Sequence, residues 1–430
     1  MRGMSLPYGD TTITLPDLRA SRVDILEPTP CPGVPDERAA LAAALAAPVN
    51  TAPIRELAKG KSSAVITVSD VTRVSKSQLL VPLMLEELAA AGIPARNVTV
   101  LFAVGGHRLL TPEEQAFLIG EAAASGVTMV NHNSRDDSAL VYAGQTRAGT
   151  PVWINKLFVA APLRIVTGAA NYHDFAGFSG GPKGVLPGVA GQRSINANHV
   201  RMFSPEPGGG FHPKAMNGET TANPTWSDMA EAAHKVEPDF LVNVALNANQ
   251  ELVAVGAGTL IAGHAAACDA IKRMFRVPAT QQADVVIGSP GGYPKDIDFY
   301  QGLKTLINVQ RLVRPGGAVV LLAECREGLG APSLGEWLSR GDASVVERDV
   351  KADFSIIGKI AYQIHTWVQR HRIIMVTDMD DPVLSDTGIV YARSLDGALG
   401  LAYGTVHTET PSIAVVPTGN ITFCDVGSLA

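Results

Sequence analysis

The chain has 430 residues, about two to three times the usual length of a single domain, so we expect two domains with separate cores. Apolar residues make up 46% of the sequence and charged residues 18%, which excludes a mainly disordered chain and is typical of an α/β enzyme. The net charge is −6 and basic residues do not cluster, which argues against a nucleic-acid partner.

Other patterns bear on where the protein works. Residues 1–15 lack the charged and apolar regions of a secretory signal, and no apolar run reaches the roughly 18 residues of a membrane-spanning helix. The cysteines are scattered without a Cys-x-x-Cys pair, which argues against a zinc knuckle or a disulfide framework; they are Cys31, Cys268, Cys325 and Cys424. We therefore expect a cytoplasmic protein with no membrane partner.

From residue 63 the sequence alternates between short β-branched runs and longer helical patterns, which is typical of parallel sheets covered by helices. In the first half we predict strands at 64–69, 97–104 and 164–170, and helices at 77–91, 111–124, 225–236 and 259–275. In the second half we predict strands at 283–288, 317–323, 372–377 and 413–417, and helices at 299–314 and 357–370.

The pattern restarts near residues 276–283, where we place a domain boundary. We assign residues 1–275 to an N-terminal α/β domain and residues 284–430 to a smaller C-terminal α/β domain, each a mostly parallel sheet flanked by helices. The last segment belongs either to the second domain or to a return to the first.

Glycines are dense at 177–191, directly after a predicted strand. Because glycine allows close approach of the backbone, such a segment can seat a phosphate or a flat cofactor, although the composition equally suits a surface loop. Pro182 precedes Lys183 and Gly184 follows it, which disfavours a phosphate-binding loop of the nucleotide triphosphatases. A lysine among glycines can act as a cation, a Schiff-base former or an amine acylated by a cofactor.

Polar side chains also follow two neighbouring predicted strands. Asp70-Val71-Thr72-Arg73 follows the first, and Gly105-Gly106-His107-Arg108 follows the second. The carboxyl ends of parallel strands lie at one edge of a sheet, so Asp70, Arg73, His107 and His173 can share one site. Each of them alone is more often an ordinary turn residue.

In the second half, Ser289–Asp296 follows a predicted strand, and Tyr300, Gln301 and Lys304 lie in the first turns of the next helix. Gln301 and Lys304 are three positions apart and therefore lie on one face. These two side chains can bind a carboxylate, or they can simply face solvent at the start of the helix.

Together these motifs resemble the nickel-pincer-dependent lactate racemase family, over roughly residues 63–420. The resemblance is carried by His173-Asp174-Phe175 through Lys183-Gly184 to His199, by the two strand ends, and by Tyr300-Gln301 with Lys304. It implies a two-domain α/β isomerase with its active site between the domains. It also implies a nickel-pincer nucleotide (pyridinium-3,5-bisthiocarboxylic acid mononucleotide) and the enzymes that make and load it as partners.

The resemblance assigns a role to each matched residue. His107 and His173 would be the acid–base pair, His199 the protein ligand of nickel, and Lys183 the covalent attachment point of the cofactor. Further cofactor-binding residues would be Asp70, Thr72, Gly180, Gly181, Pro182 and Tyr300, and substrate-binding residues would be Arg73, Gln301 and Lys304. The expected reaction is racemisation of a 2-hydroxy acid, most simply lactate, by hydride transfer to and from the cofactor.

The identity of the substrate stays open. Lactate racemases have a pocket tryptophan late in the second domain, and here Ile360 falls at that place, with Tyr362, His365 and Trp367 nearby. Malate, longer aliphatic or aromatic 2-hydroxy acids and sugar acids are alternatives. A non-catalytic carboxylate- or nucleotide-binding protein is the alternative of another class, and a dehydrogenase is disfavoured because no Gly-x-Gly-x-x-Gly turn opens a helix after the first strand.

Overall fold

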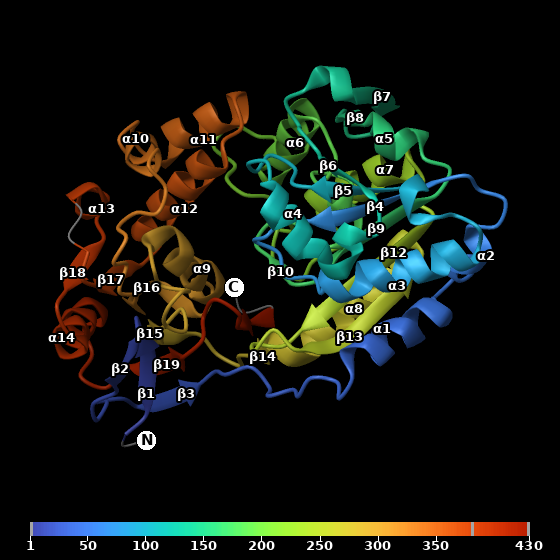
Figure 1. The fold of residues 1–430 in the computed structure, drawn as a ribbon. Coiled ribbons are helices and arrows are strands. Elements are labelled where there is room, and N and C mark those ends of the chain that lie inside the picture. The colour runs from blue at the N-terminus through green and yellow to red at the C-terminus, as the bar shows by residue number, and fades with distance from the viewer. Residues whose placement is uncertain (1–2, 380–381, 428–430) are drawn as a thin grey trace. The chain divides into compact units, whose positions relative to one another are not determined.

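The computed structural model describes residues 3–379 and 382–427, which form two compact units (Figure 1). The N-terminal unit comprises residues 31–205 and 211–274, and the C-terminal unit comprises the described residues up to 30, residues 206–210 and those from 275 onward. Each unit is built on a six-stranded sheet, as the alternating strand and helix pattern predicts. Among the residues described, no helix is both long enough and apolar enough to cross a membrane.

The sheet of the N-terminal unit has the strand order β13-β12-β9-β4-β5-β6, in which only the pair β12–β13 is antiparallel. In that order the strands are Leu252–Gly258, Phe240–Leu246, Arg164–Ala169, Ala64–Ser69, Val98–Ala103 and Thr128–Asn131. Its helices of at least eight residues are α1 (Glu37–Ala46), α3 (Ser77–Ala90), α4 (Pro112–Ile119), α6 (Gln192–His199), α7 (Pro224–His234) and α8 (Leu260–Phe275). A hairpin of β7 (Leu140–Gln145) and β8 (Pro151–Asn155) lies outside the sheet.

Alternate residues of these strands face two different layers. Ile66 and Val68 of β4, like Val242 of β12, lie in one apolar core with buried side chains of α1 and α3, such as Leu41 and Met84. The opposite face is covered by α8 and by the glycine-rich loop, because a Cβ on Gly263 would meet Leu241 and a Cβ on Gly184 would meet Val166. The glycine-rich segment therefore packs on the sheet.

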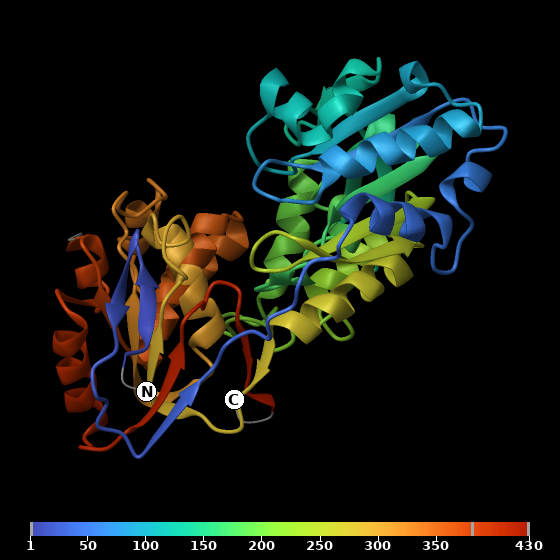
Figure 2. The same ribbon diagram turned by 60° about the horizontal axis from the view of Figure 1, so that its bottom comes forward.

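The C-terminal sheet is wholly parallel, with the order β18-β17-β16-β15-β19-β3. In that order its strands are Val390–Ala392, Arg372–Val376, Val313–Leu322, Ala283–Gly288, Ser412–Val416 and Arg22–Ile25. Its helices include α9 (Phe299–Val309), α11 (Ala343–Ala352), α12 (Ile356–Arg370) and α14 (Leu395–Val406). Helix α14 packs on the face that carries Val285 and Ile287, whereas α9 approaches the other face at Gly288 (Figures 1 and 2).

The predicted assignment of residues 1–30 to the N-terminal domain is wrong. Strand β3 adds to the C-terminal sheet by pairing with β19, so the described residues up to 30 belong to the C-terminal unit. Residues 206–210 also belong there, since Lys351 Nζ donates to the Glu206 carbonyl at 2.8 Å and Gly210 N donates to Glu347 Oε1 at 3.3 Å. The last described strand, β20 (Phe423–Asp425), pairs with β14 (Arg276–Pro278) and does not return to the N-terminal unit.

The predicted helix 299–314 is too long, because α9 ends at Val309 and Val313 already starts β16. A capping box starts α4, since Thr111 accepts a hydrogen bond from Glu114 N and the Glu114 carboxylate accepts one from Thr111 N.

Candidate active site

Asp70 and His107 come together at the carboxyl ends of β4 and β5, which are neighbouring parallel strands. Asp70 Oδ2 lies 2.8 Å from His107 Nδ1, and Asp70 Oδ1 accepts hydrogen bonds from Thr72 N (2.8 Å) and Thr72 Oγ1 (2.5 Å). Burial raises the pKa of the Asp70 carboxyl, but the hydrogen bonds from His107 and Thr72 outweigh it and hold the pKa at about 2. The ionised carboxylate can only accept, so His107 Nδ1 carries a proton and leaves Nε2 for acid–base work.

A second group gathers around the buried ring of Phe175. His173 packs edge-on against this ring at 4.5 Å between centroids, His199 packs against it at 5.1 Å, and Lys183 Nζ lies 5.5 Å from its centroid. The segment that runs from the end of β9 to the end of α6 thus brings together His173, Lys183 and His199, which lie up to 26 positions apart.

The surroundings of His173, Lys183 and His199 favour the uncharged form of each side chain. Burial, followed by the charge of Lys183, lowers the pKa of His173 to about 4, although the Asp174 carboxylate 3.1 Å from its Nδ1 opposes the shift. Burial, followed by the charge of Arg73, lowers the pKa of Lys183 to about 7. Burial also lowers the pKa of His199, with Lys183 as the next cause. At neutral pH both imidazoles are neutral, and a large share of the Lys183 amine is unprotonated.

Arg73 connects the two groups electrostatically. Its backbone N–H donates to the Asp70 carbonyl at 3.0 Å, and its charge depresses the pKa values of His173 and Lys183. The exposed Arg73 side chain is thus a cation on the same side of the unit as the buried groups.

The glycines of the loop are required by protein packing. Gly180 and Gly181 have positive φ (77° and 56°), and Gly181 N donates to Asn243 Oδ1 at 2.7 Å. A Cβ on Gly180 would lie 2.5 Å from Asn243 Oδ1, and one on Gly181 would lie 2.6 Å from the His264 ring. We expected this backbone to approach a cofactor closely. At Gly180 and Gly181 it instead approaches β12 and α8. Pro182 and Lys183 follow in a short 3-10 helix, Gly181–Gly184.

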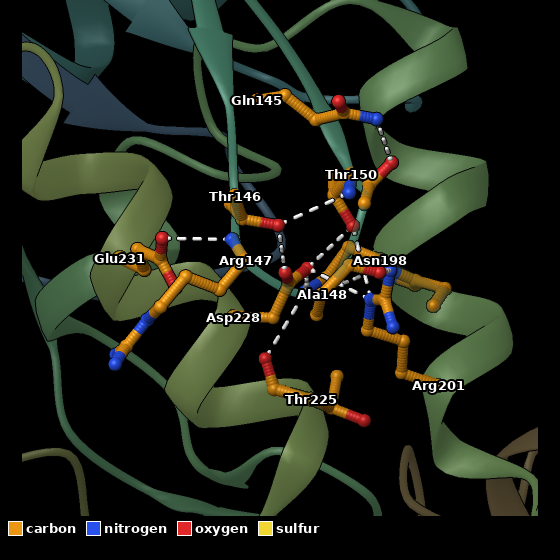
Figure 3. Close-up of polar contacts among 12 residues, drawn as sticks. Gln145, Thr146, Arg147, Ala148, Thr150, Asn198, Arg201, Thr225, Asp228 and Glu231 are labelled. Atoms are coloured by element: carbon orange, nitrogen blue, oxygen red, sulfur yellow. Dashed lines mark hydrogen bonds and ion pairs between the residues drawn. The ribbon is translucent and has the colours of Figure 1, made fainter.

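His199 is the last residue of α6, and its imidazole is held from one side. His199 Nδ1 lies 3.2 Å from Asn198 Oδ1, and the backbone of Ile195 one turn earlier also bonds to the ring. Asn198 in turn donates to Asp228, a carboxylate of α7 on which several donors converge (Figure 3). Phe175 lies in the motif that carries the family resemblance but was given no role of its own, and no sequence pattern pointed to Asp228. Only the adjacency of Asn198 to His199 could have drawn attention to Asn198.

The other residues that the resemblance assigns to cofactor or substrate binding lie in the C-terminal unit. Tyr300, Gln301 and Lys304 occupy the first turns of α9, whose N-terminus is capped by Asp298 Oδ1 through a 2.7 Å bond from Gln301 N. Lys304 Nζ donates to Gln301 Oε1 at 2.6 Å, which places both side chains on one face as predicted. Ile360, Tyr362 and Trp367 of α12 are buried.

The side chains at the candidate site suit a metal ion whose other ligands come from a cofactor. Within the described part of the chain, no group of three or more His, Cys, Asp or Glu side chains is arranged to hold a metal ion. His199 offers one neutral imidazole, which is a suitable ligand for nickel only if the remaining donors come from a cofactor. The partly neutral Lys183 amine nearby is suited to bond covalently to such a group.

Comparisons with known proteins agree with these features. The family model for the lactate racemase N-terminal domain matches residues 8–210, and that for the lactate racemase C-terminal domain matches residues 278–423. Lactate racemase from Lactiplantibacillus plantarum is 32% identical over 86% of this chain and 87% of its own length. Lactate racemase from Thermoanaerobacterium thermosaccharolyticum is 32% identical over 97% of this chain and 98% of its own.

Solved structures extend the comparison to the fold. The lactate racemase apoprotein from Thermoanaerobacterium thermosaccharolyticum superposes with a TM-score of 0.87 at 30% identity, covering 98% of this chain and all of the other. A protein from Thermotoga maritima shares the fold at 18% identity, with a TM-score of 0.61 over 86% of this chain and 97% of its own. The two family models and the identity along most of the chain show that the protein belongs to the lactate racemase family.

Proposed function

We propose that the protein is a racemase that interconverts D- and L-lactate with a nickel-pincer nucleotide as cofactor. The observation that carries this proposal is the pair of histidines: His107, oriented by Asp70, and His173, kept neutral by burial. Two acid–base groups are what inversion of a single carbon centre requires, since each enantiomer needs a base for its hydroxyl proton. Membership of the lactate racemase family supports the choice of substrate.

Removal of the α-proton of lactate would leave a carbanion beside a carboxylate, which is poorly stabilised. Oxidation to a planar 2-keto acid avoids this, and the bound cofactor supplies the hydride acceptor. One neutral imidazole would take the hydroxyl proton as the carbinol carbon is oxidised, and the imidazolium of the pair that faces the product oxygen would supply a proton when the keto acid is reduced. His173 is neutral at pH 7 and can serve as this base directly, while the Asp70 carboxylate stabilises the charge that His107 would gain in the same role.

His199 would hold the nickel, and Lys183 would bond covalently to the cofactor. The pKa of about 7 leaves enough unprotonated Lys183 amine for such a bond at neutral pH. Thr72, Pro182 and Tyr300 would contribute further cofactor contacts. Enzymes that synthesise the cofactor would be the partners for loading.

The substrate carboxylate would be bound by cations and an amide. Arg73 is an exposed guanidinium near the buried histidines, and Lys304 is an ammonium paired with the neutral Gln301 side chain. Ile360 in place of the expected tryptophan keeps malate, longer 2-hydroxy acids and sugar acids as second candidates. The retention of both histidines argues against a protein that only binds carboxylates.

The test is a chiral assay of the full chain, co-expressed with the cofactor-synthesising enzymes. We expect pure L-lactate and pure D-lactate each to become a racemic mixture, and nickel to co-purify with the protein. The variants His107→Ala and His173→Ala should lose racemisation while keeping nickel, whereas His199→Ala should lose nickel. His234→Ala is the matched control, because the His234 ring bonds to Ala230 O in its own helix. Nickel-loaded protein that leaves lactate and the other 2-hydroxy acids optically pure would overturn the proposal.

A further inference from the structure

The carboxylate of Asp228 is buried in α7, with only 1% of its side chain exposed, and receives donors from two other segments. Thr146 Oγ1 (2.5 Å) and Thr150 Oγ1 (2.7 Å) reach it from the turn between β7 and β8. Asn198 Nδ2 (2.8 Å) and Arg201 Nε (3.3 Å) reach it from α6 and the turn that follows (Figure 3). Asp228 therefore fixes the end of α6 at the residue that precedes His199.

These bonds also determine which way the Asn198 amide points. Asn198 Nδ2 has two acceptors, Asp228 Oδ2 at 2.8 Å and the Thr225 carbonyl at 3.1 Å, so the amide nitrogen must lie on that side. The amide oxygen then faces His199 Nδ1 at 3.2 Å. Because an amide oxygen only accepts, His199 Nδ1 must carry the proton, and the lone pair of the neutral ring lies on Nε2.

We propose that Asp228 is a positioning residue for the metal ligand: through Asn198 it holds His199 in the Nδ1–H form and presents Nε2 to nickel. The inference rests on the proposed role of His199 and deepens it. Hydrogen-bonded partners of this kind orient a ligating histidine, and their loss typically costs about 10–100-fold in metal affinity. Asp228 acts here only through Asn198 and does not touch the metal.

The first measurement is the proton position on His199 in the metal-free full chain. A long-range ¹H–¹⁵N spectrum of the histidine rings, assigned with His199→Gln, distinguishes the Nδ1–H form from the Nε2–H form. We expect wild-type His199 to be in the Nδ1–H form. An Nε2–H ring would overturn the inference, whether or not the protein racemises lactate.

The second measurement is the rate at which the loaded protein loses nickel to a chelator, followed by metal analysis. Asn198→Ala and Asp228→Ala should lose nickel about 10–100-fold faster than the wild type. Asp228→Asn keeps an oxygen for Asn198 and should stay close to the wild-type rate. Glu231→Gln is the matched control, because Glu231 lies on the same helix but pairs only with the exposed Arg147 among the contacts drawn in Figure 3.

The outcomes separate this inference from the proposed function. A wild-type protein that never carries nickel would overturn the proposed function and the inference with it. Nickel held equally firmly by wild type and Asn198→Ala, or lost from Asp228→Asn as fast as from Asp228→Ala, would overturn only the inference. If Asp228→Ala fails to fold, Asn198→Ala and Asp228→Asn still decide the question.

Discussion

The carboxylate of Asp70 lies 2.8 Å from the Nδ1 atom of His107, and this contact joins the ends of two adjacent parallel strands. His107 is otherwise half exposed, so the contact is the main restraint on the orientation of its ring. A buried acceptor that orients an exposed imidazole is the arrangement found in many acid–base sites.

Replacing Asp70 with Asn should therefore reduce turnover more than binding. The amide keeps the shape but loses the charge that stabilises protonated His107, and a hydrogen bond to a charged group is worth roughly 1.5–3 kcal/mol, or about 10–100-fold in rate. The measurement is kcat and KM for lactate in both directions. Glu114→Gln, which disrupts the neighbouring surface pair with Arg108, should leave both constants unchanged. Equal kcat in Asp70→Asn and wild type would contradict the role of Asp70.

The depressed pKa of His173 predicts how the protein responds to acid. The folded state binds this proton less readily than the unfolded state, so His173 stays neutral until the pH falls through about 4. In a histidine ring spectrum of the metal-free chain, His173 should therefore not titrate between pH 8 and pH 5. Asp174→Asn removes a carboxylate that raises this pKa, and should move the titration to still lower pH. A midpoint near 6.5 would contradict the burial argument.

The sequence and the structure agree best where local rules apply. The proximity of Asp70 and His107 could be predicted because parallel strands end at a common edge, and the pairing of Gln301 with Lys304 follows from helix spacing. The addition of β3 to the sheet beside β19 could not be predicted, because it joins residues nearly 400 positions apart and no local pattern encodes it. Asp228 could not be predicted for a similar reason: its partners lie 27 to 82 positions away, and an aspartate on a helix otherwise suggests a solvent-exposed face.

The packing of the glycine-rich loop predicts that Gly181→Ala destabilises the protein even without cofactor. The added Cβ would lie 2.6 Å from the His264 ring, so we expect a loss of roughly 1–3 kcal/mol on top of the cost of positive φ. Gly60→Ala is the matched control, since Gly60 also has positive φ but has no atom within 4 Å of such a Cβ. Urea unfolding of the metal-free chain measures both variants. Equal losses would mean that backbone conformation alone, and not the contact with His264, requires glycine at 181.

Removing the ammonium of Lys304 should weaken substrate binding. Lys304→Met keeps the length of the side chain but loses the charge and the bond to Gln301 Oε1, so KM for lactate should rise by about tenfold, equivalent to roughly 1.4 kcal/mol. Lys272→Met is a control of the same chemistry at a helix surface, where Lys272 pairs with Asp269. An unchanged KM in Lys304→Met would remove Lys304 from the carboxylate site.

The environment of Lys183 makes a further prediction, which can be tested before any cofactor is loaded. Burial and the charge of Arg73 lower the pKa of Lys183 to about 7, so its amine should react with an acylating reagent at neutral pH, where ordinary lysines are protonated. The rate of labelling of Lys183, followed by peptide mass spectrometry between pH 5 and 10, should reach half of its maximum near pH 7.

Arg73→Gln removes one of the two causes that lower the pKa of Lys183. The midpoint of labelling should therefore move to higher pH, though not to that of an ordinary lysine, because the burial of Lys183 remains. Lys156, an exposed lysine of the same unit, is the internal control for the reactivity of the reagent. A midpoint for Lys183 above pH 9, or one that does not respond to Arg73→Gln, would contradict an amine prepared for covalent attachment.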